Sequence, residues 1–198
     1  MQSEKELIIA CLKGNRKAQK FLYDKYSPEM IKICSRYCGN RFMAEEAMQE
    51  GFLSVFKHLN QLQEPGKLRV WIKQIMVNSS LMKIRKKDPL VFCSTELLDD
   101  SQTNEIFADD AVEYKNEDLM KILDNMPRGY KIIFNLYAFE KYSHKQIAET
   151  LNISENTSKS QLSRARNYLR ARLNDLTFTY SNGLGVFAGA LISIISMR

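Results

Sequence analysis

The sequence predicts an all-α protein of two helical domains joined by a flexible acidic linker. Proline and glycine are scarce among the 198 residues, with 4 and 8 copies, and apolar residues recur at the helical spacings of three and four. The net charge of +6 is unevenly distributed. Residues 1–90 hold 17 Lys and Arg against 9 Asp and Glu, residues 91–124 hold 2 against 10, and residues 125–180 hold 9 against 4. Two basic segments around an acidic one indicate two units that meet a polyanion and a linker that does not.

The first domain is expected to span residues 1–88. A break at Gly14 separates its first two helices, and Pro28 stands where a proline can begin the next helix. Gly39 ends that helix, because glycine readily adopts the left-handed conformation found there. A basic run followed by Pro89 closes the domain. The helices are expected, in order, within residues 4–27 (two helices), 29–38, 43–62 and 68–87.

An acidic linker over residues 89–113 and a second domain over residues 114–176 are expected to follow. The linker has no sustained helical period, and so long a segment without one is unusual inside a single compact domain. In the second domain a first helix stops before Pro127. Residues 177–198 form an apolar tail to which no role is assigned.

The stretch from Ser143 to Arg170 has the layout of a helix-turn-helix. Ser143 is a good N-cap, and Gln146 three residues later completes a capping box. Asn152 can take the left-handed conformation at the turn, and Ser154 caps the longer helix that follows. This layout predicts that the longer helix lies in a groove of duplex DNA.

The polarity of the longer helix favours the same function. With Leu162 at the centre and about 100° per residue, the buried stripe consists of Ser158, Leu162, Ala165, Leu169 and Leu173. The side chains that face away are Asn156, Thr157, Ser160, Ser163, Arg164 and Asn167. One flank holds Lys159, Arg166 and Arg170, and the other holds Gln161 and Arg172. No acidic residue lies between positions 156 and 167, whereas a solvated helix usually mixes both signs. The pattern favours base reading by the exposed face and phosphate contacts by the flanks.

Four segments resemble bacterial RNA polymerase sigma factors of the extracytoplasmic-function type. YSHKQIAETLNISENTSKSQLSRARNYLRARL resembles region 4, and MPRGYKIIFNLYAFEKYS resembles the helix before it. MAEEAMQEGFLSVFKHL resembles region 2.2, and LRVWIKQIMVNSSLMKIRKK resembles regions 2.3 and 2.4. The resemblance implies a sigma region 2-like bundle and a sigma region 4-like helix-turn-helix domain. It also implies core RNA polymerase, promoter DNA and an anti-sigma factor as partners.

The resemblance further implies roles for individual residues. The segment that binds the clamp helices of the polymerase is matched by Glu46, Gln49 and Glu50. The segment that recognises the −10 element contains Trp71, Asn78, Arg85, Lys86 and Lys87. Trp71 is equally compatible with a core position, and Asn78 is favoured because an amide in an apolar stretch needs a partner. For residues 85–87, phosphate contacts are favoured over the alternative of a solvated basic run. The −35 contact positions are matched by Lys159, Ser160, Ser163 and Arg164, with Asn156 and Thr157 beside them and Arg166 and Arg170 as contacts to the DNA backbone.

Other classes of function find less support. The sequence has no glycine-rich phosphate loop, no cluster of metal ligands and no paired cysteine and histidine, so neither an enzyme nor a cofactor or metal is expected. The cysteines are expected to be free thiols in the cytoplasm. The main alternative is a helix-turn-helix regulator that binds duplex DNA without polymerase. The interpretation as a membrane-tethered protein is supported only by the apolar run 183–197. Its 15 residues are fewer than the about 20 that a transmembrane helix needs. A docked extension and a partner-binding segment are the other interpretations of this run.

Overall fold

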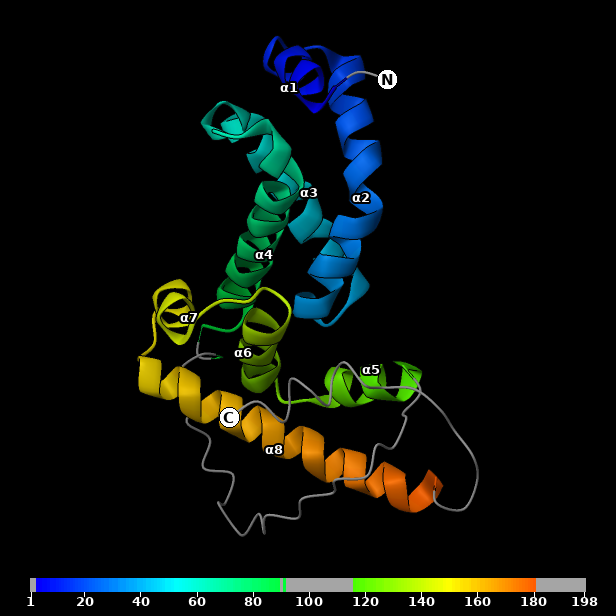
Figure 1. Cartoon of the computed structure of the whole chain (residues 1–198), viewed down its shortest axis with the longest axis vertical. Helices are drawn as coiled ribbons and strands as arrows, with labels where there is room; N and C mark the ends of the chain where they lie inside the picture. The colour runs from blue at the N-terminus through cyan, green and yellow to red at the C-terminus, as the bar shows by residue number, and fades with distance from the viewer. Residues whose placement is uncertain (1–2, 90, 92–115, 181–198) are drawn as a thin grey trace. The chain divides into compact units, whose positions relative to one another are not determined.

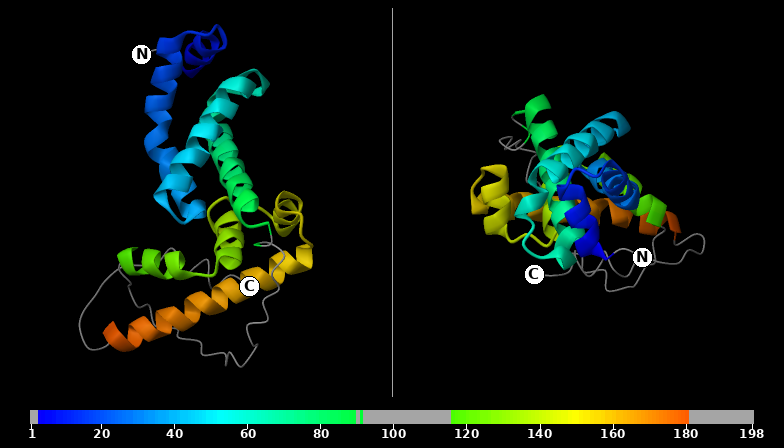
Figure 2. Two further views of the ribbon diagram at one scale, coloured as in Figure 1. Left: turned by 180° about the vertical axis from the view of Figure 1, so that it is seen from behind. Right: turned by 90° about the horizontal axis from the view of Figure 1, so that it is seen from above.

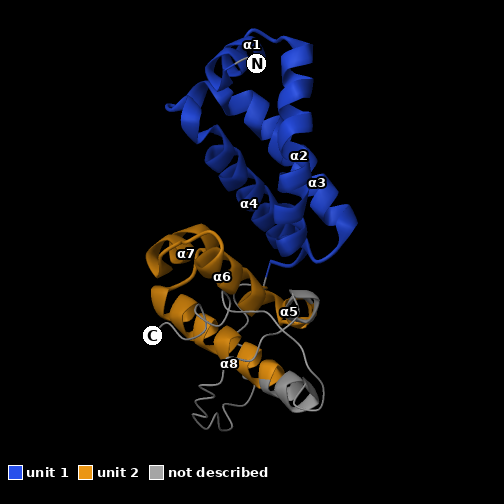
Figure 3. Ribbon diagram, turned by 45° about the vertical axis from the view of Figure 1, so that its right-hand side comes forward, with its two compact units in different colours: residues 1–89 blue, residues 90–198 orange. Residues whose placement is uncertain are grey.

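The structure, a computed structural model, describes residues 3–89, 91 and 116–180 (Figure 1). In these residues every regular element is a helix. The chain divides into two compact units, unit 1 with residues 1–89 and unit 2 with residues 90–198 (Figure 3). The predicted linker lies almost wholly outside the described residues, and the apolar run 183–197 lies entirely outside them.

Unit 1 contains four α-helices and two short 3-10 turns. Its elements are α1 (Glu4–Leu12), α2 (Arg16–Cys38), α3 (Arg41–His58), η1 (Leu59–Gln61), η2 (Pro65–Lys67) and α4 (Leu68–Lys87). The three long helices pack against one another, and α1 packs on α2 and on both turns (Figure 2). The core between the long helices consists of fully buried side chains, among them Leu22, Met30, Val55, Ile72, Met76 and Ile84.

Short-range signals in the sequence account for the helix ends of unit 1. Ser3 caps α1 in a capping box with Glu6. The Oδ1 atom of Asn15 accepts two backbone N–H groups at the start of α2. Gly39 ends α2 with φ at 74°, a conformation that strains residues with a Cβ, and Asn40 then caps α3. Each signal acts within four residues, which is why the breaks at Gly14 and Gly39 were predictable.

The prediction that Pro28 begins a helix is wrong. The α2 helix runs unbroken from Arg16 to Cys38 with Pro28 inside it. A proline in a helix interior removes one N–H donor and leaves a carbonyl four residues earlier, that of Asp24, without its helical partner. Pro28 is exposed, so water can hydrate this carbonyl. Met30 just beyond it is fully buried, and the packing of the helix against the core outweighs the local cost.

The α3 and α4 helices approach each other closely at Gly51. This glycine is buried, and a Cβ placed on it would overlap the Sδ atom of Met76 and lie 3.4 Å from Oγ of Ser79. Met76 is itself fully buried. The absence of a side chain at position 51 therefore allows the two helices to come within reach of each other's polar groups.

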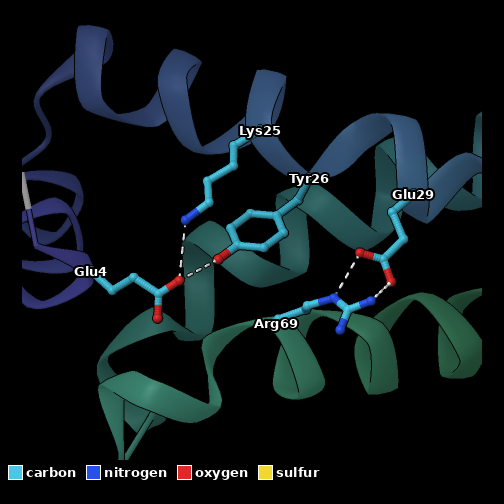
Figure 4. Close-up of polar contacts among 5 residues, drawn as sticks. All are labelled: Glu4, Lys25, Tyr26, Glu29 and Arg69. Atoms are coloured by element: carbon cyan, nitrogen blue, oxygen red, sulfur yellow. Dashed lines mark hydrogen bonds and ion pairs between the residues drawn. The ribbon is translucent and has the colours of Figure 1, made fainter. Parts of the chain in front are cut away.

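Two polar contacts tie α2 to its neighbours (Figure 4). Glu4 of α1 accepts hydrogen bonds from Oη of Tyr26 at 2.9 Å and from Nζ of Lys25 at 3.1 Å, and these bonds, that from Tyr26 foremost, lower the pKa of Glu4. Arg69 of α4 donates from Nε and Nη2 to both oxygens of Glu29, at 2.9 and 2.7 Å, which lowers the pKa of Glu29. Such bidentate pairs fix orientation as well as distance.

The described residues of unit 2 form four further helices, α5 (Asn116–Asn125), α6 (Arg128–Ala138), α7 (His144–Leu151) and α8 (Glu155–Tyr180). The first three all pack on α8. Its core consists of buried side chains from α6, α7 and α8, among them Ile132, Phe134, Leu136, Ile147, Ala165 and Leu169. The ammonium group of the buried Lys131 is paired with Asp124 at 2.7 Å.

The α7 and α8 helices form a helix-turn-helix with the predicted caps. Ser143 and Gln146 make the capping box, and Asn152 ends α7 in the left-handed region with φ at 55° and ψ at 51°. Ser154 accepts the N–H of Thr157 at 2.9 Å and so caps α8. These four sequence predictions are confirmed.

Candidate nucleic-acid interface

The α8 helix has one buried and one exposed side. The five residues of the predicted buried stripe are each 6% exposed or less, which confirms that stripe. On the opposite side Asn156, Ser160 and Ser163 are exposed, and Thr157 and Arg164 are half-buried. A free face of short polar side chains with one arginine lets a helix backbone approach the floor of the major groove and offers hydrogen bonds to base edges.

Gln161 does not lie on an exposed flank, contrary to the prediction. Its side chain is 3% exposed, and a Cβ placed on Gly129 of α6 would lie 3.2 Å from its Oε1 atom. Among the described residues this Oε1 atom has no hydrogen-bond partner. The missing side chain at Gly129 leaves room that Gln161 fills, so tertiary packing overrides the period of the helix.

The three cations predicted on the other flank of α8 have different surroundings. Lys159 is exposed. Arg166 is half-buried, with its guanidinium 5.6 Å from the centre of the Tyr137 ring on α6. Arg170 is exposed and donates to Oδ1 of Asn167 at 3.3 Å. Lys159 and Arg170 can therefore reach outward, whereas Arg166 is held against α6.

The exposed face of α4 in unit 1 is also free of acidic residues. Val70 and Met82 are 64% and 69% exposed, and Gln74 and Asn78 are exposed between them. These four residues recur every four positions, so they lie along one side of the helix. Trp71 is half-buried beside them. Val70, Gln74 and Met82 were not among the predicted site residues, although their spacing from Asn78 would have indicated them.

The basic end of α4 consists of exposed side chains at Arg85, Lys86 and Lys87. Cations at a helix C-terminus are stabilised by the helix dipole, so the run has a structural role whatever it binds. The ammonium group of Lys87 lies 3.7 Å from Sδ of Met43 on α3.

The three residues predicted to bind the polymerase clamp, Glu46, Gln49 and Glu50, lie three and four positions apart and so on one side of α3. The ammonium group of Lys83, on α4, lies 2.8 Å from Glu50 and 3.5 Å from Glu46. The hydrogen bond from Lys83 to Glu50 is the main reason why the pKa of Lys83 is raised. Both carboxylates therefore link α3 to α4, although their side chains remain 41% and 57% exposed.

Gln49 lies at a shallow groove between α2 and α3. The groove has a volume of about 310 Å³ and is lined by Tyr23, Ser27, Pro28, Ile31, Glu45, Met48 and Gln49. Sequence reasoning missed Lys83 and the groove, since both depend on the register between two helices. Glu45 could have been found, because it lies one helical turn before Gln49.

The matching family models and the relatives found by sequence agree on one family. Residues 22–89 match "Sigma-70 region 2" and residues 116–169 match "Sigma-70, region 4". The chain is 30% identical to the ECF RNA polymerase sigma factor SigW of Bacillus subtilis, over 87% of this chain and 97% of that protein. It is 27% identical to SigM of the same organism, over 77% and 93%. The solved structure of RpoE with the anti-sigma factor NepR from Bartonella quintana aligns with a TM-score of 0.49 and 19% identity, covering 78% of this chain and 96% of that one.

A helix-turn-helix unit preceded by a region 2 unit defines a sigma factor rather than a regulator that acts without polymerase. The chain belongs to the extracytoplasmic-function sigma factors. It directs promoter-specific transcription together with RNA polymerase. None of the helices in the described part of the chain is long and apolar enough to cross a membrane.

Proposed function

We propose that the two units of this sigma factor have separate tasks. Residues 1–88 bind core RNA polymerase and the −10 element, and residues 114–176 read the −35 element as duplex DNA. The observation that carries this proposal is the exposed face of α8 within residues 156–167, which has no acidic side chain and lies opposite a stripe of five buried residues. The polymerase performs the chemistry, and this chain, acting in the cytoplasm, contributes recognition alone. An anti-sigma factor as a further partner stays a prediction.

The exposed face of α8 has the chemistry that base reading requires. Ser160 and Ser163 are short enough to let the helix backbone approach base edges, and Arg164 can donate two hydrogen bonds to a guanine. Lys159 and Arg170 extend from the flank, where charge-assisted contacts to phosphates fix the position of the helix without reading sequence. Asn156 and Thr157, at the N-terminal end of α8, complete the proposed −35 site.

The exposed face of α4 is suited to unpaired bases. The amides of Gln74 and Asn78 can bond to exposed base edges, and the apolar side chains of Val70 and Met82 can cover base faces that have lost their stacking partners. Trp71 offers an aromatic edge at the same face. The cations of the basic run, residues 85–87, can neutralise the phosphates of the same strand.

The groove between α2 and α3 is the proposed contact with a helix of the polymerase clamp. Its apolar members Ile31 and Met48 give packing surface, and Glu45 and Gln49 give acceptors for a basic or polar partner helix. Glu46 and Glu50, on the same helix as Gln49, hold α3 against α4 through their ion pairs with Lys83. Their proposed role is therefore to hold α3 in position, with Gln49 as the predicted residue that touches the partner.

The direct test is run-off transcription with purified core polymerase over a pool of genomic promoters. We expect initiation at specific sites only when this chain is present. Absence of core-dependent initiation with a folded protein would refute the proposed function. Tight sequence-specific duplex binding without polymerase would instead support the regulator alternative.

A second test assigns the −35 contacts. Replacing Ser160 and Arg164 together by alanine should reduce discrimination between −35 sequences about tenfold or more, because each good base contact contributes about 1–3 kcal/mol. Binding to core polymerase should be retained. The matched control replaces Lys32 and Ser35, exposed on α2, which removes the same charge and hydroxyl from unit 1. If the Ser160 and Arg164 variant lost polymerase binding as strongly as it lost −35 discrimination, the division of tasks between the two units would be contradicted.

A further inference from the structure

Three helices of unit 2 meet at His144, the first residue of α7. Its Nδ1 atom lies 2.9 Å from Oγ of Ser158 on α8, and Ser158 is fully buried. Its ring stacks on Tyr137 of α6, with the ring centres 5.1 Å apart and the planes at 28°. The imidazole is therefore fixed in position at the start of the recognition helix.

The surroundings of His144 carry a net positive charge. Two cations of α8 act on it, Lys159 and Arg166, and the carboxylate of Glu155 on the same helix opposes them. The α6 helix contributes the neutral phenol ring of Tyr137, which lies against both the imidazole and the guanidinium of Arg166. Burial foremost, and then the two cations, lower the pKa of His144 below its ordinary value. In the free protein the imidazole of His144 is accordingly harder to protonate than that of an unperturbed histidine.

The second nitrogen of this imidazole remains available. Among the described residues Nε2 of His144 has no hydrogen-bond partner, and the residue is only half-buried. The bond to Ser158 survives either protonation state, because the hydroxyl can donate to a bare Nδ1 or accept from Nδ1–H. Protonation therefore adds a charged donor without breaking the junction of the three helices.

We propose that His144 is a proton-linked contact to a phosphate of duplex DNA. When the duplex binds, the imidazole takes up a proton from solution and Nε2–H donates to a phosphate oxygen that Lys159 and Arg166 also attract. A phosphodiester is the ligand that fits, since it is anionic at every relevant pH and accepts several hydrogen bonds at once. The N-terminal end of α7 adds the positive end of its dipole at the same place. This inference rests on the proposed DNA-binding role of α8.

The proposal fixes the direction of a pH effect. The phosphate offsets the two cations, so the pKa of His144 rises in the complex. DNA affinity then increases as pH falls through the interval between the bound and the free pKa. The gain is complete below the free pKa and is lost above the bound pKa. A rise of about one unit in the pKa of His144 on binding corresponds to about tenfold tighter binding of DNA at the acid end.

The test measures binding of the full chain to a labelled mixed-sequence DNA duplex by fluorescence anisotropy, between about pH 5.5 and about pH 8. We expect about tenfold tighter binding at the acid end. His144→Gln should bind with the same affinity at both ends, because glutamine stays neutral. His144→Lys should bind tightly throughout. The control is His58→Gln, which replaces the chain's second histidine, located in unit 1 beside Ser54, and should keep the full pH dependence.

A second measurement does not depend on the stability of a variant. Titration of the two histidine ring signals of the unaltered chain by NMR, with and without the duplex, gives the pKa of each directly. A pKa of His144 that does not rise on DNA binding would overturn the inference, and so would a pH dependence that persists in a folded His144→Gln variant. Binding that is present but independent of pH refutes this inference alone, whereas no duplex binding and no polymerase-dependent initiation at any pH would refute the proposed function.

Discussion

Replacing Gly51 with alanine tests how closely α3 and α4 pack in unit 1. The added methyl group would meet the thioether of Met76 and the hydroxyl of Ser79 on α4. Two effects oppose each other. Alanine stabilises a helix interior relative to glycine by about 1 kcal/mol. Overpacking a filled core costs about 1–3 kcal/mol.

The burial of Met76 decides which effect is larger. A thioether is flexible, but this one is fully buried and cannot swing into solvent, so it must displace its neighbours. We expect Gly51→Ala to lower the free energy of unfolding by about 1 kcal/mol. Met76→Ala alone should lower it by about 3 kcal/mol through the cavity it leaves. In the double variant the alanine at position 51 fills part of that cavity, so the free energy of unfolding should fall by only about 2 kcal/mol. The two single losses would add to about 4 kcal/mol, so the coupling between the two sites is about 2 kcal/mol.

Urea unfolding followed by tryptophan fluorescence measures these values. Trp71 is the only tryptophan of the chain and lies on α4, so the signal reports unit 1. Gly66→Ala is the matched control, because a Cβ at Gly66 meets nothing within 4 Å, and we expect its stability to change by at most about 0.5 kcal/mol. A Gly51→Ala variant stabilised by about 1 kcal/mol, or a double variant whose losses simply add, would refute the close approach of the two helices.

Three further outcomes follow from single sites. Burial raises the pKa of Cys34 to about 11, so only about one thiol in a thousand is ionised near pH 8 and mass mapping should find Cys34 unmodified by alkylating reagents until the chain unfolds. Lys141 has φ at 61°, so Lys141→Gly should stabilise unit 2 by about 0.5 kcal/mol in thermal melts, and a loss of stability would contradict the strain. The low pKa of Glu29, caused by Arg69, gives stability that is present above the unfolded pKa and disappears as pH falls through the folded pKa. Glu29→Gln should therefore lose less stability on acidification than the unaltered chain, and an equal loss would exclude the effect.

The sequence was most informative where structure depends on neighbours within one helical turn. The capping box at Ser143, the left-handed turn at Asn152 and the cap at Ser154 each rely on atoms no more than four residues away. The buried stripe of α8 follows from helical period alone. These short-range features include the face proposed to read DNA, so that part of the candidate site was predictable.

Features that depend on a second helix were not predictable. Pro28 carries a strong local signal to begin a helix, yet the packing of α2 on α3 and α4 keeps the helix continuous. Gln161 is buried because Gly129, on α6, leaves space for it. The pairing of Lys83 with two carboxylates on α3 requires the register of α3 and α4, which one sequence does not reveal.

The arrangement around Lys83 affects how mutations in α3 combine. Glu46 and Glu50 are one turn apart and share a single cation, so each can keep the ammonium group in place when the other is lost. Single neutral substitutions at either position are therefore buffered, and only the double substitution removes the counter-charge of Lys83. Such redundancy makes position-by-position scanning underestimate the pair, and the two carboxylates have to be varied together before their contribution becomes visible.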